Sequence, residues 1–242
     1  MKKLIFLFGL LSLLFYSSCE KESDESPDTE RIVIGNADQS NMVVSLINPM
    51  LQIASSENGG FVPDSIDLDN DEVYDIVFTS FGQRWANMSS CGIEVINDYF
   101  EILVSEIIDS VLYTYDNQNS QINSAMVTWN TFSQFMSYSG NDSLSYSHKE
   151  YCVKNYNSGD IIELDDTILV WKTSGVFASY TEGYNYYSTF YQHFRMGFWN
   201  DKGEMYLCFR KKQGPQSKYG WIKAGIEWNR IITISEYAIG RG

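Results

Sequence analysis

Short runs of β-branched and aromatic residues, separated by turn-forming residues, recur along this chain from residue 31 onward. Such runs predict strands, and many short strands with turn signals between them are typical of antiparallel sandwiches and barrels. We therefore predict an all-β fold, an antiparallel β-sandwich of a jelly-roll-like or similar type. The clearest early runs are Arg31–Ile34, Val43–Ile47, Asp75–Ser80, Ile93–Val104, Ile161–Leu164 and Ile168–Trp171, the last two separated by a turn at Asp165-Asp166.

The last sixty residues show the strand pattern most clearly. In Phe194–Phe198, aromatic and other apolar residues alternate with polar or small ones, which indicates a strand with one buried face. Asn200–Gly203 is a turn signal, so we predict that this strand forms a hairpin with Met205–Arg210. Two more strands are predicted at Tyr219–Lys223 and Arg230–Tyr237.

The first nineteen residues decide where this chain is expected to work. Lys2 and Lys3 precede an apolar run from Leu4 to Phe15, and small residues then lead to Cys19. A spanning helix needs roughly 20 apolar residues, so this run is short for one. The pattern resembles a bacterial lipoprotein signal peptide, in which Cys19 is acylated and becomes the mature N-terminus. An ordinary cleaved secretory signal is the main alternative.

Residues 19–30 are polar and acidic and have nothing apolar to bury, which predicts a solvated tether. Acidic residues directly after a lipidated Cys resemble the surface-export signal of lipoproteins from Bacteroidetes-type bacteria. We therefore expect an outer-membrane lipoprotein that faces either the cell surface or the periplasm. The predicted organisation is a signal peptide at 1–18, the tether at 19–30 and a single β-sandwich domain at 31–242.

Two segments inside the predicted domain, Val104–Leu112 and Thr131–Met136, remain open as one or two short helices, although neither has a capped 3.6-residue period. The hydrophobic content of 44% is enough for a core. The chain has only four prolines and no Gly/Ser-rich linker after residue 31, which favours one domain over two.

The formal net charge of −14 argues against a nucleic-acid partner, because a polyanion requires a basic surface. The acyl group on Cys19 is then the expected membrane contact. After Cys19, the odd number of remaining cysteines allows at most one internal disulfide. Cys91 and Cys152 can pair or stay free, whereas Cys208 lies in an apolar run and is expected to be a small buried hydrophobe.

One segment has the composition of a metal site. Asp67, Asp69, Asp71 and Asp75 occupy positions 1, 3, 5 and 9 of an EF-hand-like loop, and Val73 at position 7 would offer its backbone carbonyl. This spacing folds oxygen ligands around a hard cation, and carboxylates so close together repel one another unless a cation neutralises them. The segment therefore predicts a structural calcium site.

Two positions in this loop depart from the EF-hand pattern. Glu72 stands where such loops usually have the Gly of the sharp turn, and Phe78 stands where they have a bidentate Glu. Shorter Asp-x-Asp-x-Asp-x-x-x-Asp loops of extracellular modules lack the distal Glu, and for these the Kd is on the order of 10⁻⁴–10⁻³ M. The alternative interpretation is an Asp/Asn-rich turn that leads into a strand.

The two ends of the expected domain are similar to surface lipoproteins of Bacteroidetes-type bacteria that have no assigned function. The similar segments are Asp64–Phe78, Tyr219–Ile222 and Ile231–Ala238, with Phe194–Phe198 similar to the strand before the final hairpin in such proteins. The resemblance implies a β-rich, surface-anchored domain and brings no established activity with it. Residues 84–190 are not covered by it.

We assign no catalytic residues. His148 and His193 are the only histidines, and no Gly-x-Ser-x-Gly elbow, phosphate-cradling loop or dinucleotide motif accompanies them. Tyr184, Tyr186 and Tyr187 belong to an aromatic stretch that can stack on sugar rings, so they are candidate glycan contacts; the alternative is that they pack the core.

The sequence therefore favours a lipid-anchored envelope β-domain, a non-enzymatic binding or structural module with a structural calcium site. The alternative is a secreted glycan-acting hydrolase that uses a pair of carboxylates, which the abundance of Asp and Glu leaves open. The expected partners are the membrane, through acylated Cys19, and a glycan.

Overall fold

The computed structural model describes residues 31–36, 41–55, 59–83, 88–113, 123–128, 132–138, 144–164, 167–185, 190–200, 202–214 and 216–241. Side chains are described throughout these ranges except within 107–149 and 181–196. The described part of the chain is built from strands and turns and has no helix, which confirms the all-β prediction.

The strands follow one another with short connections. The first eight are β1 (Arg31–Val33), β2 (Met42–Ala54), β3 (Phe61–Ile66), β4 (Ile76–Gln83), β5 (Met88–Val95), β6 (Phe100–Tyr113), β7 (Asn123–Thr128) and β8 (Phe132–Tyr138). The remaining strands are β9 (Leu144–Val153), β10 (Ile161–Glu163), β11 (Val170–Lys172), β12 (Ser174–Asn185), β13 (Phe190–Met196), β14 (Gly203–Gln213), β15 (Gln216–Glu227) and β16 (Ile231–Gly240).

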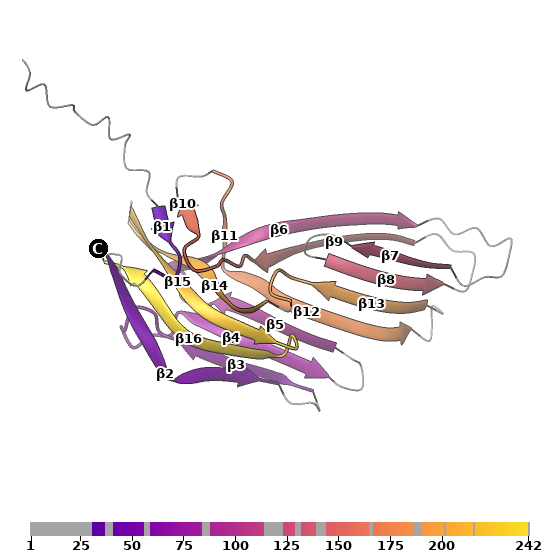
Figure 1. Ribbon diagram of the computed structural model, residues 1–242, viewed down its shortest axis with the longest axis horizontal. Helices are drawn as coiled ribbons and strands as arrows, with labels where there is room; N and C mark the ends of the chain where they lie inside the picture. The colour runs from indigo at the N-terminus through magenta and orange to yellow at the C-terminus, as the bar shows by residue number, and fades with distance from the viewer. Residues whose placement is uncertain are drawn as a thin grey trace, which may run out of the picture.

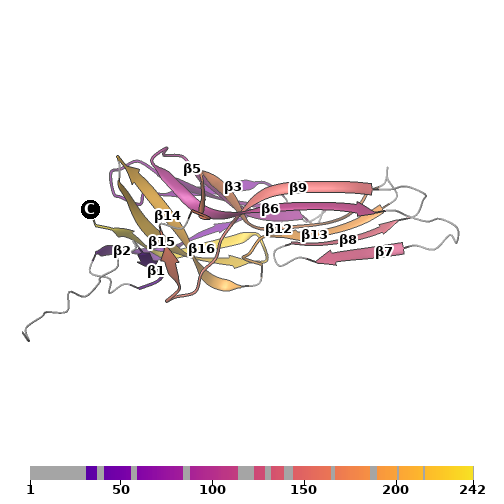
Figure 2. The ribbon, with the colours of Figure 1, turned by 90° about the horizontal axis from the view of Figure 1, so that it is seen from above.

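Fourteen of these strands form one large sheet that is almost entirely antiparallel. Its main path runs β2-β16-β15-β14-β6-β9-β12-β13-β8-β7, and β3, β4 and β5 join it through β12. The sheet curls so that β2, β16, β15 and β14 lie opposite β3, β4 and β5, which makes a nearly closed, sandwich-like body. Figures 1 and 2 show that β6, β9, β12, β13, β8 and β7 continue beyond this body as an elongated extension.

The main core lies between the two halves of the body. In β4, Ile76 and Phe78 are fully buried while Val77 and Thr79 are only partly covered, which is the alternation expected of a strand with one buried face. Leu207, Phe209, Ile222, Ile232 and Ile234 of β14, β15 and β16 belong to the same buried cluster. Full burial of one such side chain contributes roughly 1.5–3 kcal/mol.

A second, smaller core covers the other face of β14, β15 and β16. The two-stranded ribbon of β1 and β10 places Ile32 and Ile162 against Tyr206, Cys208 and Trp221. Because both faces of β14 are covered, residues 206–209 form a continuous apolar run rather than an alternating one. Cys208 is fully buried in this second core, as the sequence predicts.

The three described cysteines, Cys91, Cys152 and Cys208, are buried and form no disulfide. The disulfide between Cys91 and Cys152 that the sequence left open does not form. Both residues border β12, where Cys91 faces Ala178 and Cys152 faces Val176.

The hairpin predicted between Phe194–Phe198 and Met205–Arg210 is wrong. β13 pairs with β12 and β8, whereas β14 pairs with β15 and β6. Gly197 has a φ of 106° and passes so close to β12 that a Cβ at this position would lie 2.1 Å from the Phe177 carbonyl oxygen. Trp199 then fills the main core and donates its indole N–H to the Val153 carbonyl, 3.0 Å away, so the chain leaves the extension instead of turning back along β13.

Two other expectations differ from the structure, and a third is not tested. Val104–Leu112 and Thr131–Met136, left open as helices, lie largely within strands β6 and β8. Ile93–Val104 is two strands, β5 and β6, because the chain turns between Val95 and Phe100. Asp165-Asp166 lies outside the described residues; the strands on either side of it, β10 and β11, pair with β1 and β6 rather than with each other.

Candidate metal site

The acidic loop, residues 67–75, connects β3 to β4 at one end of the sandwich body. The Asp75 N–H donates a 2.9 Å hydrogen bond to the Ile66 carbonyl, which closes the loop at its base. Leu68 is fully buried in the main core, so the loop is pinned by an apolar side chain next to its first acidic residue. The Tyr237 hydroxyl of β16 donates to the Asp67 carbonyl at 3.2 Å.

Asp67 organises the backbone of the loop. Its Oδ1 accepts hydrogen bonds from the N–H groups of Asp69 at 3.2 Å and Asn70 at 2.7 Å, and its Oδ2 accepts one from Glu72 at 2.9 Å. Asp side chains favour such turns because they bond backbone groups two or three residues ahead. In the same way, Asp71 Oδ1 accepts from the Val73 N–H at 2.9 Å.

The backbone of the loop is left-handed at two positions that are not glycine. Asn70 has a φ of 59° and Glu72 a φ of 69°. Asn tolerates this conformation better than most residues, whereas Glu72 bears the steric cost of its Cβ. Glu72 therefore adopts a left-handed conformation that Gly would adopt without this cost.

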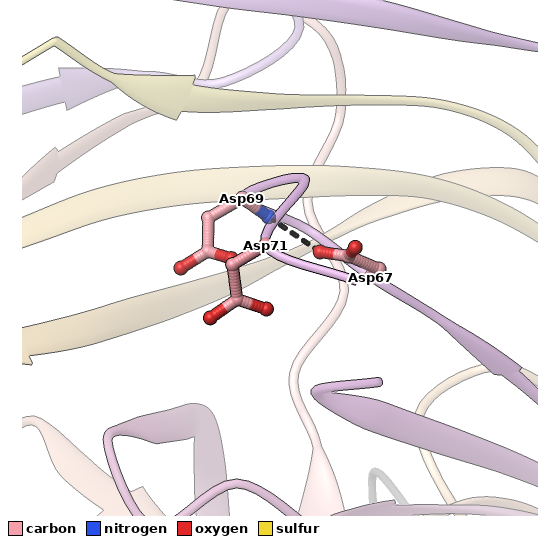
Figure 3. A group of neighbouring side chains, drawn as sticks. All are labelled: Asp67, Asp69 and Asp71. Atoms are coloured by element: carbon pink, nitrogen blue, oxygen red, sulfur yellow. Dashed lines mark hydrogen bonds between the residues drawn. The ribbon is translucent and has the colours of Figure 1, made fainter. Parts of the chain in front are cut away.

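The loop brings three carboxylates together. One oxygen each of Asp67, Asp69 and Asp71 lie within 4.8 Å of one another, and this group could hold a metal ion. Figure 3 shows the three side chains around the turn, with the Asp69 N–H donating to Asp67. A carboxylate can accept about four hydrogen bonds or ligand contacts, so Asp67 keeps capacity for a cation beside its amide partners. Hard divalent cations prefer such oxygen ligands.

Asp75, predicted as a fourth ligand, is not part of this group. It is fully buried, and its Oδ2 accepts from the Leu68 N–H at 2.7 Å while its Oδ1 accepts from Asn97 Nδ2 at 2.7 Å. Burial raises the pKa of Asp75; the two hydrogen bonds oppose this shift, and the negative charges of Asp67 and Asp71 add to it. Asp75 thus joins the base of the acidic loop to the turn between β5 and β6.

A lysine from β14 contacts the group of carboxylates. Lys211 Nζ forms an ion pair with Asp69 Oδ2, while Asp69 Oδ1 is buried without a hydrogen-bond partner in the described structure. Desolvation lowers the pKa of Lys211, and the nearby charge of Lys218 acts in the same direction, against the opposing effect of Asp67. Sequence reasoning missed Lys211, because 142 residues separate it from Asp69 and no local pattern links them.

The other predicted site residues are placed less completely. Tyr184 lies in β12, opposite Tyr191 of β13, but its side chain is outside the described part. Tyr186, Tyr187 and Cys19 lie outside the described residues altogether. Val73, predicted to offer its carbonyl, belongs to the acidic loop, where its N–H donates to Asp71.

Comparison with known proteins finds no matching family model, no similar curated sequence and no similar solved structure. Within the described ranges, no helix has the length and hydrophobicity required to cross a bilayer.

Proposed function

We propose that this protein is a lipid-anchored β-domain of the bacterial outer membrane, a non-enzymatic binding or structural module stabilised by calcium. The observation that carries the calcium site is the convergence of Asp67, Asp69 and Asp71 within 4.8 Å. Calcium is favoured over magnesium because its larger size and variable geometry suit an irregular group of loop carboxylates, whereas magnesium requires near-ideal octahedral ligands and retains its water.

The role of the ion would be structural rather than catalytic. Three like charges in one loop repel each other, and Lys211 provides only one compensating charge through Asp69. A bound calcium ion would remove the remaining repulsion. Since Leu68 and the Tyr237 hydroxyl tie this loop to the body, the ion would thereby stabilise the end of the sandwich.

The melting temperature tests this proposal. With a Kd of about 1 mM, typical of extracellular sites, 10 mM calcium stabilises a protein by about 1.4 kcal/mol. For a chain of this size, that corresponds to an increase of about 3–6 °C over the melting temperature in chelator. Magnesium at the same concentration should give a clearly smaller increase.

A matched pair of variants distinguishes calcium binding at the acidic loop from a general effect of the protein's negative charge. Asp71→Asn should reduce the calcium-dependent increase, because it removes one ligand charge from the group of three carboxylates. Asp98→Asn removes the same charge from an exposed position in the turn between β5 and β6 and should leave the increase unchanged. If the unmodified chain has the same melting temperature in calcium and in chelator, the loop is a hydrogen-bonded turn and not a calcium site.

The membrane anchor has its own test. Cells that express the chain should incorporate labelled palmitate into it, and Cys19→Ala should abolish the incorporation. A chain that remains unlabelled would leave the cleaved secretory signal as the explanation of the N-terminal segment.

One observation favours the alternative function, a glycan-acting hydrolase. A groove of about 280 Å³ lies over Gly92 on the outer face of the sheet, and Phe61, Glu94, Glu150 and Tyr151 are among the residues that line it. Two carboxylates beside aromatic rings are the groups that glycosidases use. The test is the release of reducing ends from envelope polysaccharides. This activity would be established if Glu94→Gln and Glu150→Gln both abolish the release while Glu163→Gln keeps it. Retention of a glycan without release would favour a binding module.

A further inference from the structure

A basic pocket of about 220 Å³ lies beside the acidic loop, where the end of β14, the start of β15 and the end of β16 meet. Its lining includes three cationic residues, Lys211, Lys218 and Arg241, and one carboxylate, that of Asp69. The chain as a whole has a formal net charge of −14. Three cations against one carboxylate give the lining of this pocket a net positive charge in an otherwise acidic chain, and a local excess of positive charge attracts anions.

The sheet register makes these cations neighbours. Lys211 of β14 lies directly opposite Lys218 of β15. β15 and β16 pair as far as Gly220 with Ile239, and the same antiparallel register continued by two residues brings Arg241 beside Lys218. Like charges directly opposite each other destabilise a sheet by roughly 0.2–1 kcal/mol.

On the opposite face of β14, the neighbouring cations have an ion-pair partner. Arg210 and Lys212 both form ion pairs with Glu101, at 2.6 Å and 3.5 Å. In the basic pocket, Lys211 is paired with Asp69, whereas Lys218 and Arg241 form no ion pair in the described part of the chain. Among the described residues, Lys218 and Arg241 thus have no ion-pair partner at the pocket.

We propose that the basic pocket binds a phosphate group. A phosphate monoester has up to two negative charges at neutral pH, which match the charges of Lys218 and Arg241, and three free oxygens for the lysine and arginine donors. A carboxylate offers one charge and two oxygens. The volume accommodates a phosphate with a few further atoms, and Val43 and Ile239 provide apolar contacts for the organic part of the ligand.

Two sources share this chemistry, a soluble phosphate ester and the phosphate of a membrane lipid. The C-terminus and β1 lie at the same end of the body in Figures 1 and 2. The basic pocket, which includes Arg241, is therefore at the end where the described chain begins. For a domain tethered through residue 19, this arrangement makes a lipid phosphate accessible.

Binding is tested with the full chain after its divalent cations have been removed on a chelating resin. Sodium phosphate should raise the melting temperature more than sodium chloride at the same ionic strength. The double variant Lys218→Met with Arg241→Met should bind phosphate at least tenfold more weakly. Lys212→Met, which removes the same charge from the opposite face of β14, should bind phosphate like the unmodified chain.

A loss of phosphate binding in the double variant can be distinguished from a loss of folding. Lys218→Met removes a cross-strand repulsion, so without phosphate it should melt no lower than the unmodified chain. Undiminished phosphate binding by the double variant would overturn the proposal, as would an equal effect of chloride.

Three probes identify the source: inorganic phosphate, sn-glycerol 3-phosphate, and dihexanoyl phosphatidic acid below its critical micelle concentration. If the lipid binds at least tenfold more tightly than glycerol phosphate, the apolar lining takes acyl chains and the source is the membrane. Equal affinities would assign the pocket to soluble phosphate esters. In either case the double variant must lose the binding.

Discussion

The hydroxyl of Tyr237 donates a 3.2 Å hydrogen bond to the backbone carbonyl of Asp67, which lies 170 residues earlier in the chain. The ring of Tyr237 is buried in the main core, and Asp67 begins the acidic loop. This bond joins the last strand of the sheet to the loop between β3 and β4. The conformation of the candidate metal site is therefore linked to the packing of β16.

We predict that Tyr237→Phe lowers the free energy of unfolding by about 1 kcal/mol, the usual net contribution of one partly buried hydrogen bond. The ring stays in place, so the core loses no apolar contact. Urea unfolding measures the change, and Tyr99→Phe, at an exposed position, is the matched control. A loss of the same size in both variants would show that the bond to Asp67 contributes nothing specific.

Glu72→Gly should stabilise the protein by about 0.5–1 kcal/mol. The left-handed conformation costs a non-glycine residue roughly 1–2 kcal/mol, and the greater freedom of glycine in the unfolded chain cancels part of the gain. Glu72→Ala removes the same charge but keeps the Cβ, so it should not reproduce the effect. Chemical unfolding of both variants in chelator gives the comparison; equal gains would mean that charge, not backbone strain, limits the loop.

The sequence predicted the loop well because its spacing is local. Asp67, Asp69 and Asp71 converge as the alternate positions of a tight loop must, and Glu72 takes a left-handed conformation although it is not Gly. Asp75 differs for a reason that spacing does not reveal. A buried carboxylate needs partners, and Asn97 from another turn and the Leu68 N–H provide them inside the protein.

Strands were also easier to predict than their partners. Alternation identified the strand at Phe194–Met196, and a short apolar run identified the strand at Met205–Arg210, because both are local patterns that do not depend on the neighbouring strand. Pairing depends on distant contacts. The approach of Gly197 to the backbone of Phe177 and the burial of Trp199 redirect the chain, and neither contact has a signature near residues 194–210.

The pH dependence of the free energy of unfolding should reveal the raised pKa of Asp75. Burial raises its pKa above the ordinary value of 3.8, so the folded protein binds this proton more tightly than the unfolded chain. The contribution of Asp75 to stability is then complete below about pH 4 and decreases as the pH rises through its folded pKa. Relative to Asp75→Asn, the unmodified chain should therefore lose stability as the pH increases above 4.

Urea unfolding in chelator between pH 3.5 and 7 measures this difference, with Asp64→Asn at an exposed position as the control. The control should follow the unmodified chain throughout. If the unmodified chain instead gains stability over Asp75→Asn with rising pH, the hydrogen bonds from Leu68 and Asn97 outweigh the cost of burial, and the pKa is lowered in the folded state.

The three buried thiols should be unreactive in the folded protein. Burial raises the pKa of Cys91 to about 12 in spite of a hydrogen bond with Ser80, and burial also raises the pKa of Cys208. Cys152 is fully buried as well. Since the thiolate is the reactive form and the reagent has no access, Ellman's reagent at pH 8 should react only as fast as the protein unfolds.

The same measurement tests the proposed membrane anchor. Chain isolated from membranes and denatured in guanidinium should show the three thiols of Cys91, Cys152 and Cys208 when Cys19 is acylated. A free Cys19 would add a thiol that reacts at once in the folded state, because a polar tether gives no protection. Rapid native reaction that persists in Cys19→Ala would instead show that one of the core cysteines is accessible, in conflict with their burial in β5, β9 and β14.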